Sequence, residues 1–126
     1  MPTILIVDDD ATNRAMYARL LREVGEVELA SDGQIAFEMV VAAEERGQPF
    51  DLIVMDMQMP LMTGYEATAA LRSEGYELPI LALTAQAMAG DREKCLAAGC
   101  NEYLSKPIDR ERLVMLARGL LQKPGA

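Results

Sequence analysis

The stretch Ile4–Asp10, which reads ILIVDDD, decides the fold because a short apolar run ends abruptly in acids. Two further apolar runs of the same kind, LIVM and ILAL, occupy Leu52–Met55 and Ile80–Leu83. Short runs without polar alternation are typical of strands buried on both faces, as in parallel sheets covered by helices. The sequence therefore predicts a parallel sheet with helices on both sides.

Polar residues that can take part in chemistry follow these runs directly. They are Asp8, Asp9 and Asp10 after the first run, Asp56 after the second, Thr84 after the third, and Ser105 and Lys106 after a shorter fourth run. Since the carboxyl ends of parallel strands form the ligand crevice of such sheets, we expect the acids, the hydroxyl and the ammonium to meet at one edge.

Strand and helix patterns alternate along the whole chain. The expected strands are Thr3–Val7, Glu26–Ala30, Phe50–Met55, Ile80–Leu83 and Cys100–Ser105. The expected helices cover about residues 11–24, 33–46, 65–73 and 88–98, and a last helix carries the apolar stripe Leu113, Leu116, Ala117, Leu120 and Leu121. We expect Gly25 to end the first helix in a left-handed conformation, and the partly polar second strand to lie at an edge. This alternation predicts a doubly wound α/β fold with right-handed crossovers.

Length and composition indicate one globular domain. The chain has 126 residues, of which 51% are hydrophobic and 25% charged. Lys123–Ala126 is interpreted as a tail or linker stub, so we expect the domain to cover residues 1–122. The sequence contains no apolar stretch long enough for a membrane helix, and its first residues do not form a secretory signal, so we expect a cytoplasmic location.

Charge and residue types exclude several functions. A formal net charge of -8 argues against binding to nucleic acid or to anionic membranes. The chain has no histidine, so histidine-based catalysis is excluded, and Cys95 and Cys100 alone cannot form a structural zinc site. We expect both cysteines to be reduced and inert. Met55, Met57, Met59 and Met62 are interpreted as adaptable packing rather than copper ligands.

The expected cluster of Asp8, Asp9 and Asp56 requires a cation, because crowded carboxylates raise one another's pKa and destabilise the fold. With oxygen ligands alone, the expected ion is Mg²⁺, and Mn²⁺ would also fit. Lys106 and Thr84 add a positive charge and a hydroxyl donor. Such a site is equipped for phosphoryl transfer onto a carboxylate, with Asp56 as the nucleophile. Asp10 is interpreted as simply a helix cap or a surface acid.

The chain resembles the receiver domains of two-component response regulators, which have the CheY-like fold. The resemblance rests on Asp8-Asp9, Met55–Pro60, Leu83–Ala85 and Ser105–Pro107, which together span nearly the whole chain in the family's order. It implies a flavodoxin-like three-layer sandwich with strand order 2-1-3-4-5. Thr63 is a departure, since relatives commonly carry an acid before the loop glycine.

The resemblance also implies roles for the site residues. Asp56 would be the phosphoacceptor. Asp9 would bind Mg²⁺ directly, Asp8 would bind it directly or through water, and Gln58 would contribute its backbone carbonyl.

Further roles concern the phosphoryl group and the response to it. Thr84 would donate a hydrogen bond to the phosphoryl group, and the small Ala85 would leave access. Lys106 would pair with a phosphoryl oxygen, and the bond before Pro107 would be cis. Tyr103 would be the switch aromatic that turns inward when Thr84 moves towards the phosphoryl group. The output would be a changed surface on the fourth helix, the fifth strand and the fifth helix.

The resemblance predicts a phosphorelay module that receives its phosphoryl group from a histidine kinase or a histidine phosphotransfer protein. It would then act on a downstream protein partner, and it would turn over no external substrate. Val7–Arg14 and Ala82–Ala89 are similar to receivers attached to hybrid sensor kinases, and a stand-alone regulator is the other possibility. Two further hypotheses are a phosphatase with an aspartate nucleophile, for which the chain lacks room for a cap, and a pseudo-receiver that binds partners without phosphorylation.

Overall fold

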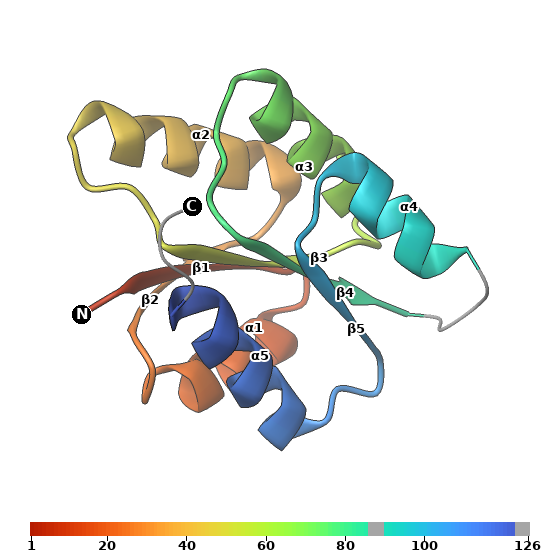
Figure 1. The fold of residues 1–126 in the computed structure, drawn as a ribbon. Helices are drawn as coiled ribbons and strands as arrows, with labels where there is room; N and C mark the ends of the chain where they lie inside the picture. The colour runs from red at the N-terminus through yellow and green to blue at the C-terminus, as the bar shows by residue number, and fades with distance from the viewer. Residues whose placement is uncertain (86–89, 123–126) are drawn as a thin grey trace.

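The computed structural model describes residues 1–85 and 90–122, which form five strands and five helices in strict alternation (Figure 1). The strands are β1 (Thr3–Val7), β2 (Glu26–Ala30), β3 (Leu52–Asp56), β4 (Ile80–Thr84) and β5 (Glu102–Ser105). The helices are α1 (Ala11–Leu21), α2 (Gly33–Glu45), α3 (Gly64–Ser73), α4 (Asp91–Ala98) and α5 (Arg110–Gln122). The predicted tail, Lys123–Ala126, lies outside the described residues.

The strands form one parallel sheet in the order β2-β1-β3-β4-β5. The predicted fold class and strand order are therefore confirmed, and β2 lies at an edge as expected. The register pairs Val7 with Met55 and Asp56 with Leu83, so the three central strands end close together, each one residue beyond the last. This alignment is what brings distant polar residues together.

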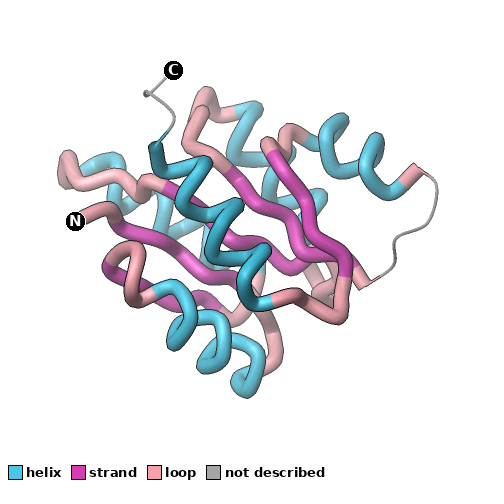
Figure 2. The backbone as a smooth tube through the Cα atoms, turned by 60° about the horizontal axis from the view of Figure 1, so that its bottom comes forward, coloured by secondary structure: helices cyan, strands magenta, loops and turns pink. Residues whose placement is uncertain are grey.

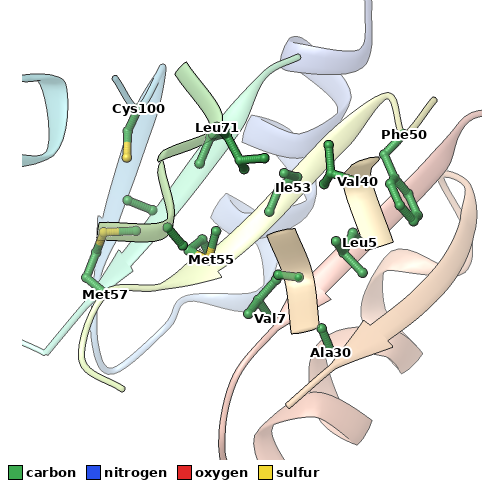
Figure 3. Close-up of a cluster of buried hydrophobic side chains, with 14 of the residues drawn as sticks. Leu5, Val7, Ala30, Val40, Phe50, Ile53, Met55, Met57, Leu71 and Cys100 are labelled. Atoms are coloured by element: carbon green, nitrogen blue, oxygen red, sulfur yellow. The ribbon is translucent and has the colours of Figure 1, made fainter. Parts of the chain in front are cut away.

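Helices cover both faces of the sheet. Figures 1 and 2 show α1 and α5 on one face and α2, α3 and α4 on the other. Alternate strand residues enter two separate cores. Ile4, Ile6 and Val54 pack with α1 and α5, whereas Leu5, Ile53 and Met55 pack with α2 and α3 in the core shown in Figure 3. Because both faces are buried, the central strands need no polar alternation, which explains the apolar runs.

Several element ends differ from the sequence predictions. Helix α1 ends at Leu21 rather than Val24, and Gly25 does not have a left-handed backbone. The prediction that Gly25 stops this helix was therefore wrong. A side chain at Gly25 would lie 2.7 Å from the carbonyl oxygen of Pro2, so the residue is small because β1 passes close to it. Gly99, in contrast, ends α4 with φ 114°, as predicted.

Strands β3 and β5 each begin two residues later than predicted. Phe50 is buried in the core but precedes Leu52, where strand pairing starts. Cys100 donates its backbone N–H to the carbonyl of Cys95 and so still belongs to the end of α4. The predicted start of α4 at Met88 lies outside the described residues, and the described helix begins at Asp91. No helix in the described part of the chain is long and apolar enough to cross a membrane.

Gly64 lets α3 start directly against the end of β3. A side chain at Gly64 would overlap the carbonyl oxygen of Asp56 and would lie 2.8 Å from the Cα of Met57. The backbone N–H of Gly64 also donates to the carbonyl of Met57 at 3.2 Å. The loop between Asp56 and α3 therefore returns tightly over the strand end.

We predict that Gly64→Ala lowers the free energy of unfolding by about 1–3 kcal/mol, because the added methyl group has no space beside the Asp56 backbone. Gly119→Ala is the matched control. It adds the same methyl group within α5, where no atom lies within 4 Å, and should stabilise the domain by about 0.5–1 kcal/mol. Urea denaturation measures both, and equal effects of the two substitutions would contradict the packing assigned to Gly64.

Candidate functional site

The carboxyl edge of the sheet gathers the polar residues that the sequence places after its strands. Asp8 follows β1, Asp56 ends β3 and Thr84 ends β4, and all three side chains are buried. Thr84 pairs with Ser105 across β4 and β5, which places Lys106 immediately beyond this edge. The predicted convergence of acids, hydroxyl and ammonium is therefore observed.

Three carboxylates form a compact cluster at this edge. Asp8, Asp9 and Asp56 each offer an oxygen atom, and these atoms all lie within 4.8 Å of one another. Asp8 and Asp56 are only 1% and 2% exposed, whereas Asp9 is exposed at the rim. Negative charges this close in a desolvated place repel each other strongly, so the cluster needs positive charge nearby.

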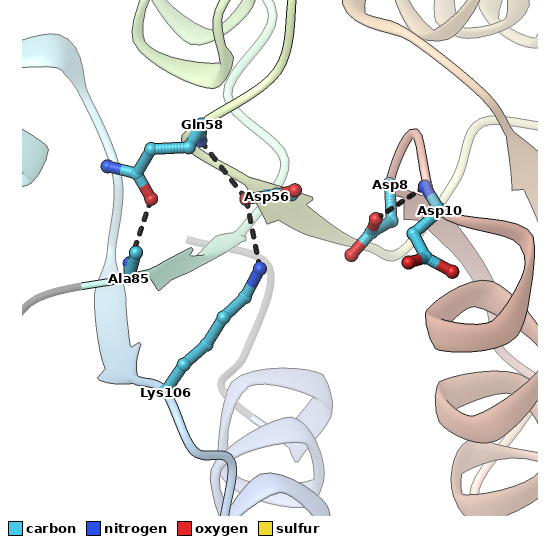
Figure 4. Close-up of polar contacts among 6 residues, drawn as sticks. All are labelled: Asp8, Asp10, Asp56, Gln58, Ala85 and Lys106. Carbon is cyan, nitrogen blue, oxygen red and sulfur yellow. Dashed lines mark hydrogen bonds and ion pairs between the residues drawn. The ribbon is translucent and has the colours of Figure 1, made fainter.

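The side chain of Asp8 is held in place but only half satisfied. Its Oδ1 accepts a hydrogen bond from the backbone N–H of Asp10 at 2.9 Å (Figure 4). Its Oδ2 is buried and has no hydrogen-bond partner among the described residues. Asp10 caps α1 by accepting from the N–H groups of Thr12 and Asn13, which confirms its predicted role. A buried oxygen without a hydrogen-bond donor is available to bind a cation, so Oδ2 of Asp8 is a candidate metal ligand.

Asp56 is contacted from two sides, as Figure 4 shows. Its Oδ1 accepts from the backbone N–H of Gln58 at 3.0 Å and lies 3.5 Å from the Nζ of Lys106. The Lys106 side chain is 27% exposed, whereas that of Asp56 is only 3% exposed. The carboxylate is thus oriented by its own loop and faces a positive charge.

The side chain of Gln58 has a contact that the sequence did not predict. Its Oε1 accepts from the backbone N–H of Ala85 at 2.8 Å, and so connects the loop after β3 to the end of β4 (Figure 4). A contact between these two loops had not been expected for Gln58. The residue type alone carries no signal for this bridge, because it depends on the distance between two loops.

A second unpredicted feature explains the departure at Thr63. Its hydroxyl accepts from the N–H of Glu66 at 3.2 Å, and the Glu66 carboxylate accepts from the N–H of Thr63 at 2.9 Å. This reciprocal capping box stabilises the start of α3. The spacing Thr-x-x-Glu in the sequence could have revealed it.

The remaining predicted residues lie around the site. Tyr103 lies in β5 opposite Ala82, is half-buried, and packs against the core beneath α2 and α3. The peptide bond between Lys106 and Pro107 is cis, as expected. Lys106 also donates its backbone N–H to the carbonyl of Thr84 at 2.7 Å, which connects the ends of β4 and β5.

Burial changes the acidity of the site. Desolvation raises the pKa of Asp8 above its ordinary value, and the charges of Asp9 and Asp10 raise it further, although the Asp10 N–H and Lys106 oppose this. Desolvation also raises the pKa of Asp56, against the Gln58 N–H and Lys106. Burial and the nearby Asp8 and Asp56 raise the pKa of Tyr17 to about 12. The fold therefore holds carboxylates where their ionised forms are costly.

The donor set fits a hard divalent cation. The cluster supplies oxygen atoms only, the chain has no histidine, and one buried oxygen of Asp8 has no partner among the described residues. Mg²⁺ and Mn²⁺ prefer such ligands and keep part of their water shell, which suits a cluster open at Asp9. The residues present could therefore bind a metal ion.

The chain belongs to the response regulator receiver domain family, whose model matches residues 4–118. It is 42% identical over 127 residues to the signal transduction histidine-protein kinase BarA of Escherichia coli, covering 98% of this chain and 13% of BarA. It is 42% identical over 113 residues to the osmosensing histidine protein kinase SLN1 of Saccharomyces cerevisiae, covering 87% of this chain and 9% of SLN1. The chain thus spans a small part of these curated relatives, and it is a receiver domain of two-component signalling.

Solved structures agree with this assignment. The chemotaxis protein CheY4 of Vibrio cholerae superposes with a TM-score of 0.82 at 33% identity, covering 95% of this chain and 98% of CheY4. The receiver domain of the Francisella response regulator 1452 gives a TM-score of 0.87 at 24% identity, covering 98% of each chain. The second likeness supports the fold alone.

We predict that the raised pKa values of Asp8 and Asp56 make the metal-free domain lose stability as pH rises above their ordinary value of 3.8, because both groups bind protons more tightly in the folded than in the unfolded chain. The loss begins near their ordinary pKa and is complete above the raised pKa of the folded state. Asp8→Asn should make this slope shallower, because it removes one of the two carboxyl groups whose pKa burial raises. Urea denaturation in EDTA at several pH values measures the slope, and an unchanged slope in Asp8→Asn would contradict the assigned cost of ionisation.

Proposed function

We propose that this chain accepts a phosphoryl group from phosphohistidine onto Asp56 and that Mg²⁺ is required for the transfer. The observation that carries the proposal is the position of Asp56, between the Asp8–Asp9 carboxylates and the Lys106 ammonium. A carboxylate placed between a cation site and a fixed positive charge can approach a phosphoryl group that would otherwise be repelled.

Asp56 would be the nucleophile. One of its carboxylate oxygens forms the new bond to phosphorus while the phosphorus–nitrogen bond of the donor breaks, and the imidazole leaves with the electron pair. The Gln58 N–H and the Lys106 ammonium both contact Oδ1, so the carboxylate is oriented before the donor arrives. Lys106 then neutralises charge on the transferred phosphoryl oxygens, which it can reach because the side chain is partly exposed.

The metal site would consist of Asp8, Asp9 and Asp56, with the backbone carbonyl of Gln58 as a further ligand. Bound Mg²⁺ supplies electrostatic stabilisation of the phosphoryl oxygens, and Mn²⁺ could replace it. The chain's own contribution is to hold Asp8 rigidly through the Asp10 N–H, so the cluster is formed before any ion binds.

Thr84 and Tyr103 would convert phosphorylation into a change of surface. Thr84 ends β4 beside Asp56, since Asp56 pairs with the adjacent Leu83. We propose that the hydroxyl of Thr84 turns towards the new phosphoryl group and that Tyr103, on the neighbouring strand, moves into the vacated space. Ala85 is small enough to leave the phosphoryl group accessible. The altered surface of α4, β5 and α5 would bind a downstream protein.

The donor would be a histidine kinase or a histidine phosphotransfer protein, since the relatives BarA and SLN1 are named histidine kinases. The chain would catalyse its own phosphorylation and dephosphorylation and would act on no external substrate. We place this reaction in the cytoplasm, because Cys95 and Cys100 are both buried and form no disulfide, as is usual for cysteines in a reducing compartment. Nucleic acid and membrane lipid are not expected partners of a chain with net charge -8.

We predict that incubation with acetyl phosphate and Mg²⁺ increases the mass of the chain by about 80 Da, one phosphoryl group. Asp56→Asn should abolish the gain because the nucleophilic oxygen is lost, and EDTA should reduce it by at least about 100-fold in rate. Asp51→Asn is the matched control, because Asp51 precedes β3 at the opposite end of the strand, and it should be labelled like the wild type. Intact-protein mass spectrometry makes the measurement. Unmodified wild-type protein would support a pseudo-receiver, and continuous release of phosphate would support a phosphatase.

A further inference from the structure

The loop between β3 and α3 displays an apolar side chain in an unfavourable backbone conformation. Leu61 has φ 69°, and it is the one non-glycine residue with positive φ in the described part of the chain. Its side chain is 96% exposed. A positive φ favours glycine and asparagine and is strained for leucine. The exposed side chain also gains none of the stabilisation that burial would give it. A residue that combines both features calls for a function.

The rest of this loop is anchored, so the exposure of Leu61 is not caused by a loose segment. Met59 is 5% exposed and belongs to the core between the sheet and α2 and α3. Met62 packs against the same core, and a side chain at Gly33 would lie 3.0 Å from its Cγ. The two methionines therefore hold the loop on both sides, and Pro60 and Leu61 form its exposed tip. This anchoring also confirms the predicted packing role of these methionines.

The tip is continuous with the phosphorylation site. Leu61 follows Asp56 by five residues and Gln58 by three, and Gln58 connects the loop to both Asp56 and Ala85. Whatever delivers a phosphoryl group to Asp56 must approach the carboxyl edge of the sheet, where this loop lies. The donor is therefore the molecule that would meet the tip.

Electrostatics give a reason for an apolar contact here. The chain has a net charge of -8, and the site itself contains three carboxylates, so a donor that carries a phosphoryl anion is not attracted over long distances. Salt screens such forces beyond about 8–10 Å in any case. Burial of an apolar side chain acts at contact and is indifferent to charge, so it can hold the two proteins together during transfer.

We propose that Leu61 is a docking residue for the protein that donates the phosphoryl group. Its side chain inserts into an apolar recess beside the donor's phosphohistidine. The proposal rests on the proposed function of Asp56 and adds to it the chemistry of the partner surface. The backbone of the loop is already held by its buried neighbours before the encounter, so that little backbone freedom is lost on binding.

Two donors test the proposal. Acetyl phosphate has no protein surface in which Leu61 could be buried, so its reaction reports on the chemistry at Asp56 alone. The protein donor is the autophosphorylated kinase or phosphotransfer protein that transfers fastest to the wild-type chain in a profile against those of its source organism. Leu61→Asn should lower the second-order rate of transfer from the protein donor by about tenfold to a hundredfold, the factor expected when one leucine is no longer buried. Labelling by acetyl phosphate should be unchanged.

Matched variants exclude effects on folding. Asparagine tolerates positive φ, so Leu61→Asn should unfold at or above the wild-type temperature. Leu61→Met keeps an apolar side chain and should transfer within about threefold of the wild type. Leu96→Gln changes another exposed leucine, which is 41% exposed and lies near the end of α4 that is remote from the site. This variant should receive the phosphoryl group from the protein donor at the wild-type rate.

Several results would overturn the docking role. They are a wild-type rate of protein-donor transfer in Leu61→Asn, an equal loss with both donors, and a defect only in binding a downstream partner. If the wild-type chain is labelled by neither donor, the proposed phosphorylation of Asp56 itself fails, which is a distinct outcome.

Discussion

Repulsion among buried carboxylates is the constraint on which the rest of this structure depends. Asp8 and Asp56 are almost fully buried, and together with Asp9 they place oxygen atoms within 4.8 Å of one another. Their ionised forms are disfavoured by burial, as the raised pKa values of Asp8 and Asp56 indicate. Ionisation of these buried carboxylates destabilises the fold. A functional role explains why they are present, namely that a cation and a phosphoryl group would bind at the same site.

The remainder of the domain keeps these groups in place. Two apolar cores hold β1, β3 and β4 in a fixed register, so the strand ends cannot separate to relieve the repulsion. The N–H groups of Asp10 and Gln58 orient the two buried carboxylates. Gly64 permits the close return of the chain over Asp56. The two apolar cores thus stabilise the domain, whereas the site itself destabilises it. Such a trade-off between stability and function is common in proteins.

Much of this could be predicted from the sequence. The apolar runs before Asp8, Asp56 and Thr84 identify central parallel strands, because such strands lack polar alternation, and strand ends in parallel sheets converge. The features that could not be predicted from the sequence are those that depend on distances between loops. The bridge from Gln58 to Ala85 and the exposure of Leu61 at positive φ follow from the path of the chain rather than from residue type.

The ends of individual helices were also difficult to predict from the sequence. Gly25 was expected to be left-handed, yet it is small because the carbonyl of Pro2 approaches it, and a sequence does not distinguish these two reasons for a glycine. Thr63 was noted only as a departure from relatives, although its spacing to Glu66 predicts the capping box that the structure contains.

The most direct test of the central claim is the effect of Mg²⁺ on stability at constant ionic strength. If the carboxylate cluster is a cation site, Mg²⁺ should raise the free energy of unfolding saturably, by about 2.7 kcal/mol at a hundred times its Kd. Asp9→Asn removes a ligand at the exposed rim and should weaken this effect, whereas Asp51→Asn should retain it. A wild-type stability that does not change with Mg²⁺ beyond the effect of matched sodium chloride would contradict the account.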